Sequence, residues 1–156
     1  MTDLTARQLV QHIRTQTLRT RTGILLLDAT HFGKEPDLAT RLYIEPLDYA
    51  RRIREELPEG ATHVLLDATT EEERLDAIAV AATGYECVLI YNFDLALARL
   101  ESNERTQLWK NLWASFSKKP RALLLAVPRE AAHLLPEGED REHWIEGRRM
   151  ALASEL

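Results

Sequence analysis

Residues 87–94 of the chain, CVLIYNFD, form an apolar run that ends in the polar side chains of Asn92 and Asp94. An apolar run of this length, followed by polar residues, is typical of a strand that is buried on both faces of a sheet. The segment therefore predicts a central strand whose end carries side chains with hydrogen-bonding chemistry. We expect Val88 and Ile90 to lie in the core.

Three further runs of the same kind occur at residues 24–27, 63–66 and 122–127, and they place Leu65 and Leu124 in the core. Helical patterns occupy residues 5–18, 46–57, 70–82, 102–117 and 140–153, with a shorter one at 131–135. Strands that alternate with helices predict an α/β fold with a mostly parallel, three-layer sheet of about four to five strands and helices on both faces. We expect residues 28–40 to form a loop and residues 41–44 a short extended piece.

The length of 156 residues fits one domain that can bury about two-thirds of its unfolded surface without disulfides or metals. We divide residues 1–156 of this single α/β domain into an N-terminal amphipathic helix (1–21), a sheet core (22–128) and a C-terminal helical segment (129–156). The lone Cys87 lies in an apolar run and favours a reducing cytoplasm. No apolar run approaches the roughly 18 residues of a spanning helix. We therefore expect a cytoplasmic protein without membrane contact.

The formal net charge of -5 argues against nucleic-acid binding over the whole surface, because such binding needs clustered Lys and Arg. Residues 1–22 nevertheless carry Arg7, Arg14, Arg19 and Arg21 against Asp3 alone. A local basic patch is therefore predicted on an acidic body. Nucleic acid is expected as a partner only indirectly or through this N-terminal segment.

Two of the predicted strands end in the same pentapeptide, LLDAT, at residues 26–30 and 65–69. The carboxyl ends of parallel strands meet at one edge of a sheet, so Asp28, Asp67, Asn92 and Asp94 are expected near that edge as ligand-binding candidates. One interpretation is a magnesium-dependent enzyme that acts on a phosphate-containing small molecule through Asp28, Asp67 and Asp94. The alternative is that each aspartate caps a helix or turns the chain.

The order of elements over residues 22–128 resembles the core of a P-loop NTPase of the AAA+ kind. In that family the first strand leads into G-x-x-x-x-G-K-[ST], which holds phosphate, and the third strand ends in Asp-Glu. Here Gly33-Lys34 is only a remnant of the loop, Glu35 replaces its hydroxyl residue, and Asn92-Phe93 stand in place of the acidic pair. The resemblance implies a degenerate member that has lost nucleotide hydrolysis. A flavodoxin-like or receiver-like sheet would explain the same periodicity.

The functional expectation is a non-catalytic adaptor or subunit of a larger cytoplasmic complex that binds protein partners. The five histidines show no metal-ligand spacing and no nucleophile motif is present, so we expect no catalytic residues, no metal and no cofactor. By analogy with other catalytically inactive members of ATPase families, a bacterial defence or DNA-processing assembly is the expected setting.

Aromatic and basic residues supply the candidates for partner binding. Trp109 and Trp113 lie one helical turn apart among basic neighbours, and such a stripe forms either core or the edge of a partner surface. Trp144 is expected to dock on its own domain, beside a basic edge. The full set of candidates is Arg14, Arg19, Arg21, Trp109, Trp113, Trp144, Arg148 and Arg149.

Overall fold

Five parallel strands form one sheet in the order β2-β3-β4-β1-β5 in the computed structural model, which describes residues 4–15, 18–56, 67–116 and 119–153. The strands are β1 (Thr22–Leu27), β2 (Glu45–Asp48), β3 (Cys87–Tyr91), β4 (Ala122–Pro128) and β5 (Met150–Leu152). The order differs from the 2-1-3-4-5 order of flavodoxin-like sheets. The expected parallel α/β fold is confirmed, and its flavodoxin-like variant does not describe these strands.

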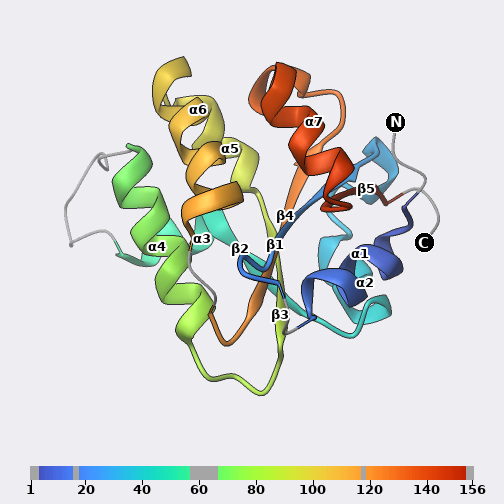
Figure 1. Ribbon diagram of the computed structural model, residues 1–156. Helices are drawn as coiled ribbons and strands as arrows, with labels where there is room; N and C mark the ends of the chain where they lie inside the picture. Colours follow the sequence, from blue (N-terminus) through green and yellow to red (C-terminus); the bar gives the residue numbers. More distant parts are fainter. Residues whose placement is uncertain (1–3, 16–17, 57–66, 117–118, 154–156) are drawn as a thin grey trace.

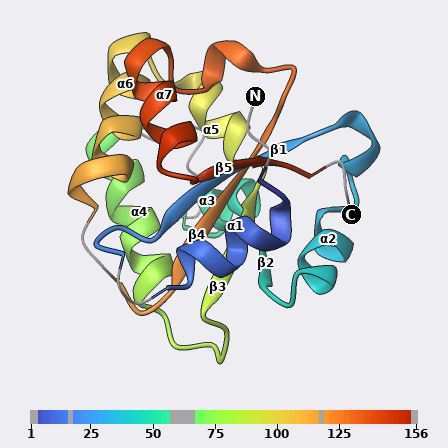
Figure 2. The same cartoon turned by 45° about the vertical axis from the view of Figure 1, so that its right-hand side comes forward.

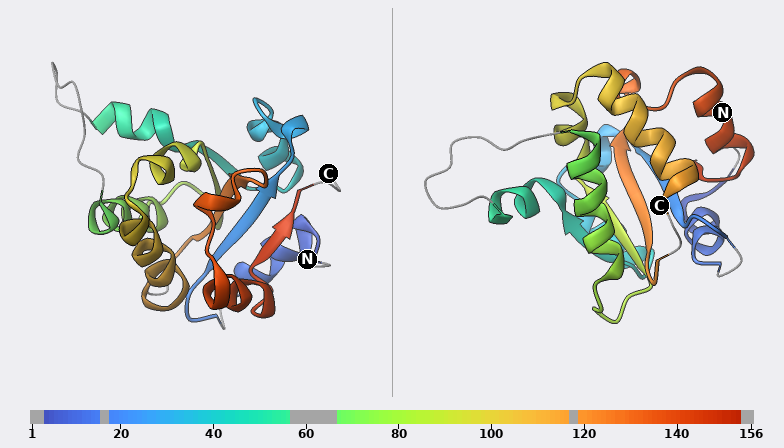
Figure 3. Two further views of the ribbon diagram at one scale, coloured as in Figure 1. Left: turned by 90° about the horizontal axis from the view of Figure 1, so that it is seen from above. Right: turned by 60° about the vertical axis from the view of Figure 1, so that its left-hand side comes forward.

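Helices cover both faces of the sheet, which gives three layers (Figure 1). One face carries α1 (Ala6–Ile13) and α2 (Glu35–Arg41), which lie side by side in Figure 2. The other face carries α3 (Tyr49–Glu56), α4 (Ala68–Val80), α5 (Phe93–Arg99), α6 (Ser102–Lys110) and α7 (Gly138–Glu146). Figure 3 shows the sheet between these two layers from two further directions. Within the described residues, no helix has the length and apolar character needed to cross a bilayer.

The central strands form because their side chains are apolar on both sides. In β1, Ile24 and Leu26 pack under the layer of α3 to α7, which we call the larger helical layer. Leu25 and Leu27 pack under α1 and α2 on the other face. The same alternation in β3 and β4 leaves Val88, Ile90 and Leu124 fully buried, as predicted. The predicted strand at residues 63–66, with Leu65, lies outside the described residues.

Residues 28–40 are not the loop that we expected. They contain a 3₁₀ turn, η1 (Ala29–His31), and the helix α2, which has Pro36 in its first turn. Proline is tolerated there because the first helical N–H groups have no intrahelical acceptor. Leu38 and Ala39 supply the buried face of α2. A helix of seven residues with two buried apolar side chains, beside the buried Glu35, gives too weak a periodic signal to be recognised in the sequence.

Residues 45–48 form a strand, although Pro46 was interpreted as the first turn of a helix. Among the described strands, β2 lies at the edge of the sheet and pairs only with β3, and an edge position tolerates a residue without an N–H donor. The helix that we expected over residues 46–57 begins at Tyr49 instead, as α3.

The C-terminal segment is not wholly helical, which corrects the prediction for residues 140–153. α7 ends at Glu146, the chain turns through Gly147 and Arg148, and β5 then pairs with β1. Arg148 has φ +58, a left-handed conformation that ends a helix. A short 3₁₀ turn, η3 (Ala132–Leu134), precedes α7 where a short helix was expected.

Helix ends agree with the sequence in part. The first helix starts where we expected it, with a capping box formed by Thr5 and Gln8, but α1 ends at Ile13 and not at residue 18. α4 begins at Ala68 and is capped by Asp67, so it starts two residues before the helical range of 70–82 that we expected. The predicted helix at residues 102–117 is divided into α6 and a π-helical turn, η2 (Asn111–Ser115).

Candidate functional site

A cavity of about 190 Å³ opens at the carboxyl ends of β1, β3 and β4. β4 lies between β1 and β3, so the loop after β1 and the turn after β3 converge over the end of β4. The polar lining of the cavity comes from Glu35 of α2, from Asn92, which follows β3, and from Asp94 in the first turn of α5. Gly33, which has φ +79, lies beside them. The apolar lining consists of Leu27, Phe32, Ala126 and Pro128.

The cavity is acidic. Glu35 and Asp94 both line it, and none of the described lining residues is basic. Burial raises the pKa of Asp94, although a backbone hydrogen bond opposes this change. Burial also raises the pKa of the neighbouring Tyr91, with further contributions from the charges of Asp48 and Glu35. Lys34 is exposed and is not among the lining residues.

Asn92 ends β3 in a left-handed conformation with φ +60, where asparagine is one of the favoured non-glycine residues. Its Nδ2 donates a hydrogen bond of 2.9 Å to Oδ1 of Asp48 at the end of β2. The same Asp48 oxygen accepts from the backbone N–H of Arg51 at 3.2 Å. The amide of Asn92 therefore ties two strand ends together and is engaged in the fold.

Phe93 points away from the cavity and into the core, where it is fully buried. Its ring meets Tyr49 edge-on at a centroid distance of 5.0 Å and Trp109 at 6.0 Å. Such edge-to-face pairs stabilise an aromatic core beyond their burial. The position after Asn92 is thus occupied by a packing residue rather than by a side chain that could reach a ligand.

Asp28 is committed to an ion pair. Its Oδ1 accepts a hydrogen bond of 3.0 Å from Arg129, which follows β4. Its backbone N–H donates to Nδ1 of His31 at 3.2 Å. Asp28 lies after β1 as predicted, yet it is not among the residues that line the cavity.

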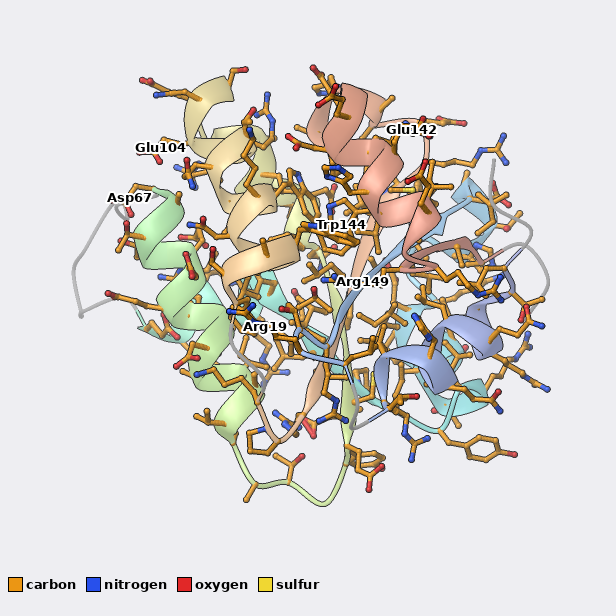
Figure 4. All side chains as sticks on the ribbon, viewed as in Figure 1. Arg19, Asp67, Glu104, Glu142, Trp144 and Arg149 are labelled. Atoms are coloured by element: carbon orange, nitrogen blue, oxygen red, sulfur yellow. The ribbon has the colours of Figure 1, made fainter. Side chains whose placement is uncertain are left out.

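Asp67 lies at the N-terminus of α4 and acts as a helix cap. Its Oδ1 accepts from the backbone N–H of Thr70 at 2.7 Å, and this hydrogen bond lowers the pKa of the carboxyl. The neighbouring N–H of Ala68 donates to Glu104 of α6 at 3.2 Å, and Figure 4 shows Asp67 and Glu104 close together. Asp67 is not among the cavity-lining residues.

The structure therefore brings together Asn92 and Asp94 of the four ligand-binding candidates and leaves Asp28 and Asp67 out of the cavity. In the described part of the chain, no three His, Cys, Asp or Glu side chains are grouped so that they could hold a metal ion. Asp28 and Asp67 instead fit the alternative interpretation, in which each aspartate caps a helix or turns the chain. The cavity instead gains Glu35, which comes from a segment that the sequence did not show to be helical.

Four of the eight partner candidates are buried in the domain, which removes their side chains from its surface. Arg21 is 2% exposed and donates to four backbone carbonyls, those of Ile13, Arg14, Lys119 and Pro120. Trp109 and Trp144 are each 1% exposed, and the indole N–H of Trp109 donates to the Leu134 carbonyl at 2.8 Å. The expected docking of Trp144 on its own domain is confirmed.

Arg149, the fourth, is a structural residue rather than part of a basic edge. Its guanidinium lies over the rings of Trp113 and Trp144, at 4.1 and 4.6 Å from their centroids. It donates to the carbonyls of Thr22 at 2.7 Å and of Leu112 and Trp113 at 3.2 Å each, and also to the hydroxyl of Thr22. Burial lowers the pKa of Arg149 to about 9. Figure 4 shows Arg149 beside Trp144, below α7.

The other four candidates reach the surface. Arg19 and Arg148 are exposed. Arg14 forms an ion pair of 2.9 Å with Glu86. Trp113 is half-buried and stacks on His143 of α7, with their rings 17° from parallel and their centroids 5.8 Å apart.

A buried ionic network in the larger helical layer was missed by the sequence analysis. Glu71, fully buried in α4, accepts from the Tyr49 hydroxyl at 2.8 Å and from Arg74 at 2.7 Å. Arg74 also donates to Glu56 at the end of α3 at 2.6 Å. These bonds link α3 to α4 beside the aromatic core. Alternation of acidic and basic residues is common on exposed helices, so this burial could not be predicted from the sequence.

Comparisons with known proteins identify no relative. No protein-family model matches the chain, and no match is found among curated proteins or solved structures.

Proposed function

We propose that this chain is a non-catalytic adaptor or subunit of a larger assembly, built on a degenerate P-loop NTPase core that has lost nucleotide hydrolysis. The proposal rests on the cavity at the carboxyl ends of β1, β3 and β4, the place where an open parallel sheet binds its ligand. The observation that carries it is the charge of that cavity, which Glu35 and Asp94 make acidic.

A triphosphate is bound in P-loop NTPases by backbone N–H groups, a lysine and a magnesium ion. Here Glu35 and Asp94 line the cavity at the strand ends, and like charges at short range repel. Lys34 is exposed and is not among the residues that line the cavity. These features support a site from which nucleotide phosphates are repelled.

The end of β3 supports the same proposal. The acidic pair of an active member holds magnesium and activates water. Asn92 uses its amide to bind Asp48, and Phe93 belongs to the buried aromatic core. Restoring acids at these positions would break an interstrand hydrogen bond and place a charge among aromatic rings. The present residues therefore serve the fold.

In this proposal, a P-loop-like fold that has lost its catalytic residues functions by binding other protein chains. By analogy with inactive members of ATPase families, we propose protein partners in a bacterial defence or DNA-processing assembly. The half-buried Trp113, whose ring lies under the Arg149 guanidinium, and the exposed Arg148, which precedes Arg149 in the sequence, are the candidates for such a contact.

The test is a thermal-shift and hydrolysis experiment with ATP and GTP plus magnesium. A nucleotide present at a hundred times its dissociation constant would add about 2.7 kcal/mol, which raises the melting temperature of a domain of this size by roughly 5–10 °C. We expect no such rise at millimolar nucleotide and no release of phosphate. A rise of several degrees that Asp94→Asn abolishes would overturn the proposal.

A double variant, Glu35→Gln with Asp94→Asn, sharpens the interpretation. Both changes keep the shape of the side chains and remove the negative charges that line the cavity. If charge is what excludes nucleotide, this variant is the form most able to gain weak nucleotide binding. A wild-type protein that binds nucleotide as well as the double variant would contradict the electrostatic argument.

A further inference from the structure

A second groove, of about 260 Å³, lies on the opposite helical layer, between α1 and the end of α2. Arg7 and Arg14 of the α1 segment line one side, and Arg41 and Tyr43 line the other. Val10 and Leu42, both buried, form its apolar floor. Figure 2 shows α1 and α2 next to each other on this face.

The groove is basic on a chain whose formal net charge is -5. None of the described lining residues is acidic. Arg7 and Arg41 are exposed and form no ion pair with any described residue, whereas Arg14 is paired with Glu86 outside the groove lining. Two guanidinium groups are therefore free to bind an anion, and a third is available at the cost of a surface ion pair of little strength.

Tyr43 adds an aromatic surface at the mouth of the groove. It is 83% exposed, the largest exposed fraction among the large apolar and aromatic side chains of the described residues. Its backbone has φ 57, an uncommon conformation for an aromatic residue. The buried Leu42 and Ile44 on either side hold this turn in place, so the ring is presented outward by a constrained backbone.

We propose that this arginine groove binds single-stranded nucleic acid. Its parts match the two requirements of such sites: cationic side chains along a groove for the phosphates, and an exposed ring on which a base can stack. Arginine is well suited to the first task because its planar fork binds two phosphate oxygens at once. To recognise a DNA duplex, a protein inserts a protruding element into a groove of the DNA. The arginine groove is instead small and concave.

An acidic polypeptide would satisfy the arginines but would make no particular use of an exposed ring. The combination of Tyr43 with Arg7 and Arg41 thus favours bases and phosphates over carboxylates. The inference does not depend on the loss of nucleotide hydrolysis, because the groove and the acidic cavity share no residue.

The experiment measures binding of the full chain to a dye-labelled thymidine oligonucleotide of about 12 nucleotides, a length within the usual site sizes. Anisotropy is followed from low to moderate salt. We expect the affinity to fall as salt rises, with a slope of roughly -0.7 for each phosphate contact. Arg7→Ala and Arg41→Ala should each reduce this slope by about that amount.

Tyr43→Ala should weaken binding roughly 5- to 150-fold, the loss expected for one stacked base, whereas Tyr43→Phe should bind as wild type. Arg54→Ala is the matched charge control, because Arg54 is an exposed arginine on α3 outside the groove. Circular dichroism spectra of all variants establish that they are folded.

Absence of oligonucleotide binding at low salt would overturn the proposal. So would variants at Arg7, Arg41 and Tyr43 that bind as Arg54→Ala does. Binding of poly-glutamate that requires the arginines, without binding of the oligonucleotide, would assign the groove to an acidic protein partner and would equally overturn it.

Discussion

Arg149 is a buried cation that has no carboxylate partner among the described residues. Its charge is balanced by the carbonyl oxygens of Thr22, Leu112 and Trp113 and by two indole faces. The carbonyls of Leu112 and Trp113 belong to the π-helical turn, whose irregular geometry leaves backbone groups to be satisfied by other donors. One arginine thus joins β1, the π-helical turn and the start of β5.

We predict that Arg149→Met lowers the free energy of unfolding by at least about 2 kcal/mol, because several buried carbonyls lose their donor. Arg149→Lys should also destabilise, since an ammonium cannot reproduce the planar fork. Chemical denaturation followed by circular dichroism measures both. The adjacent exposed Arg148→Met is the control and should stay within about 0.5 kcal/mol of wild type. An unchanged Arg149→Met would contradict the structural role.

The carboxylate of Asp67 should make stability depend on pH. Its pKa is lowered in the folded state by the N–H of Thr70, so its charged form is favoured by folding. The resulting stabilisation is fully present above the unfolded pKa of about 3.9 and is lost as pH falls through the lower, folded value. We predict that Asp67→Asn, which can still cap the helix, is less stable than wild type at pH 7.

The difference between wild type and Asp67→Asn should shrink as the pH is lowered toward the folded-state pKa of Asp67. Urea denaturation at pH 7 and at acidic pH measures it. A difference that stays constant over this range would show that the charge of Asp67 contributes nothing, and that only the hydrogen bond matters.

At the scale of elements, β3 is an interior strand of the sheet, as the sequence indicated, and Ile90 is one of its fully buried residues. We predict that Ile90→Ala lowers the free energy of unfolding by about 2–5 kcal/mol, through lost burial and the cavity left behind. Leu95→Ala is the control on the following helix, where the side chain is 52% exposed and the cost should be small. An Ile90→Ala variant within half a kcal/mol of wild type would be incompatible with this core.

The elements that could be predicted from the sequence are those whose conformation is determined by their own residues. β3 and β4 are continuous apolar runs, and any strand with both faces buried needs such a run. β2 and β5 were missed because short edge strands take their conformation from a neighbour. β5 is only three residues long and follows two arginines, and it forms because β1 pairs with it.

The candidate site followed the same rule. Asn92 and Asp94 line the cavity at the edge where we expected them, because the end of a buried strand can be recognised in the sequence. Glu35 was not recognised as a cavity residue, since its position depends on α2, a helix with little periodic signal. The burial of Arg149 could not be foreseen either, because its partners are backbone carbonyls far away in the sequence.

At the scale of the whole molecule, the C-terminal segment is integral to the domain. It supplies Trp144 to the core and β5 to the sheet. We predict that deleting residues 139–156 abolishes cooperative unfolding, because β1 would lose a neighbouring strand and the aromatic core one of its indoles. Trp144→Ala is the milder variant and should cost about 3–5 kcal/mol.

Thermal denaturation of both forms measures this effect. A truncated chain that unfolds cooperatively at the wild-type temperature would mean that the C-terminal segment is only appended to the domain. Stability of Trp144→Ala within about 0.5 kcal/mol of wild type would contradict the contribution of its indole to the core.

The grouping of the aromatic rings has an optical consequence. All three tryptophans of the chain lie together in the larger helical layer, with ring centroids 5.8 Å apart for Trp109 and Trp144 and 5.3 Å apart for Trp113 and Trp144. Excitation energy is shared among indoles at such separations, so intrinsic emission is a single signal from this layer. A change in this tryptophan emission therefore indicates that α6, α7 and β5 have separated. The layer of α1 and α2, which contains no tryptophan, can change without altering the emission.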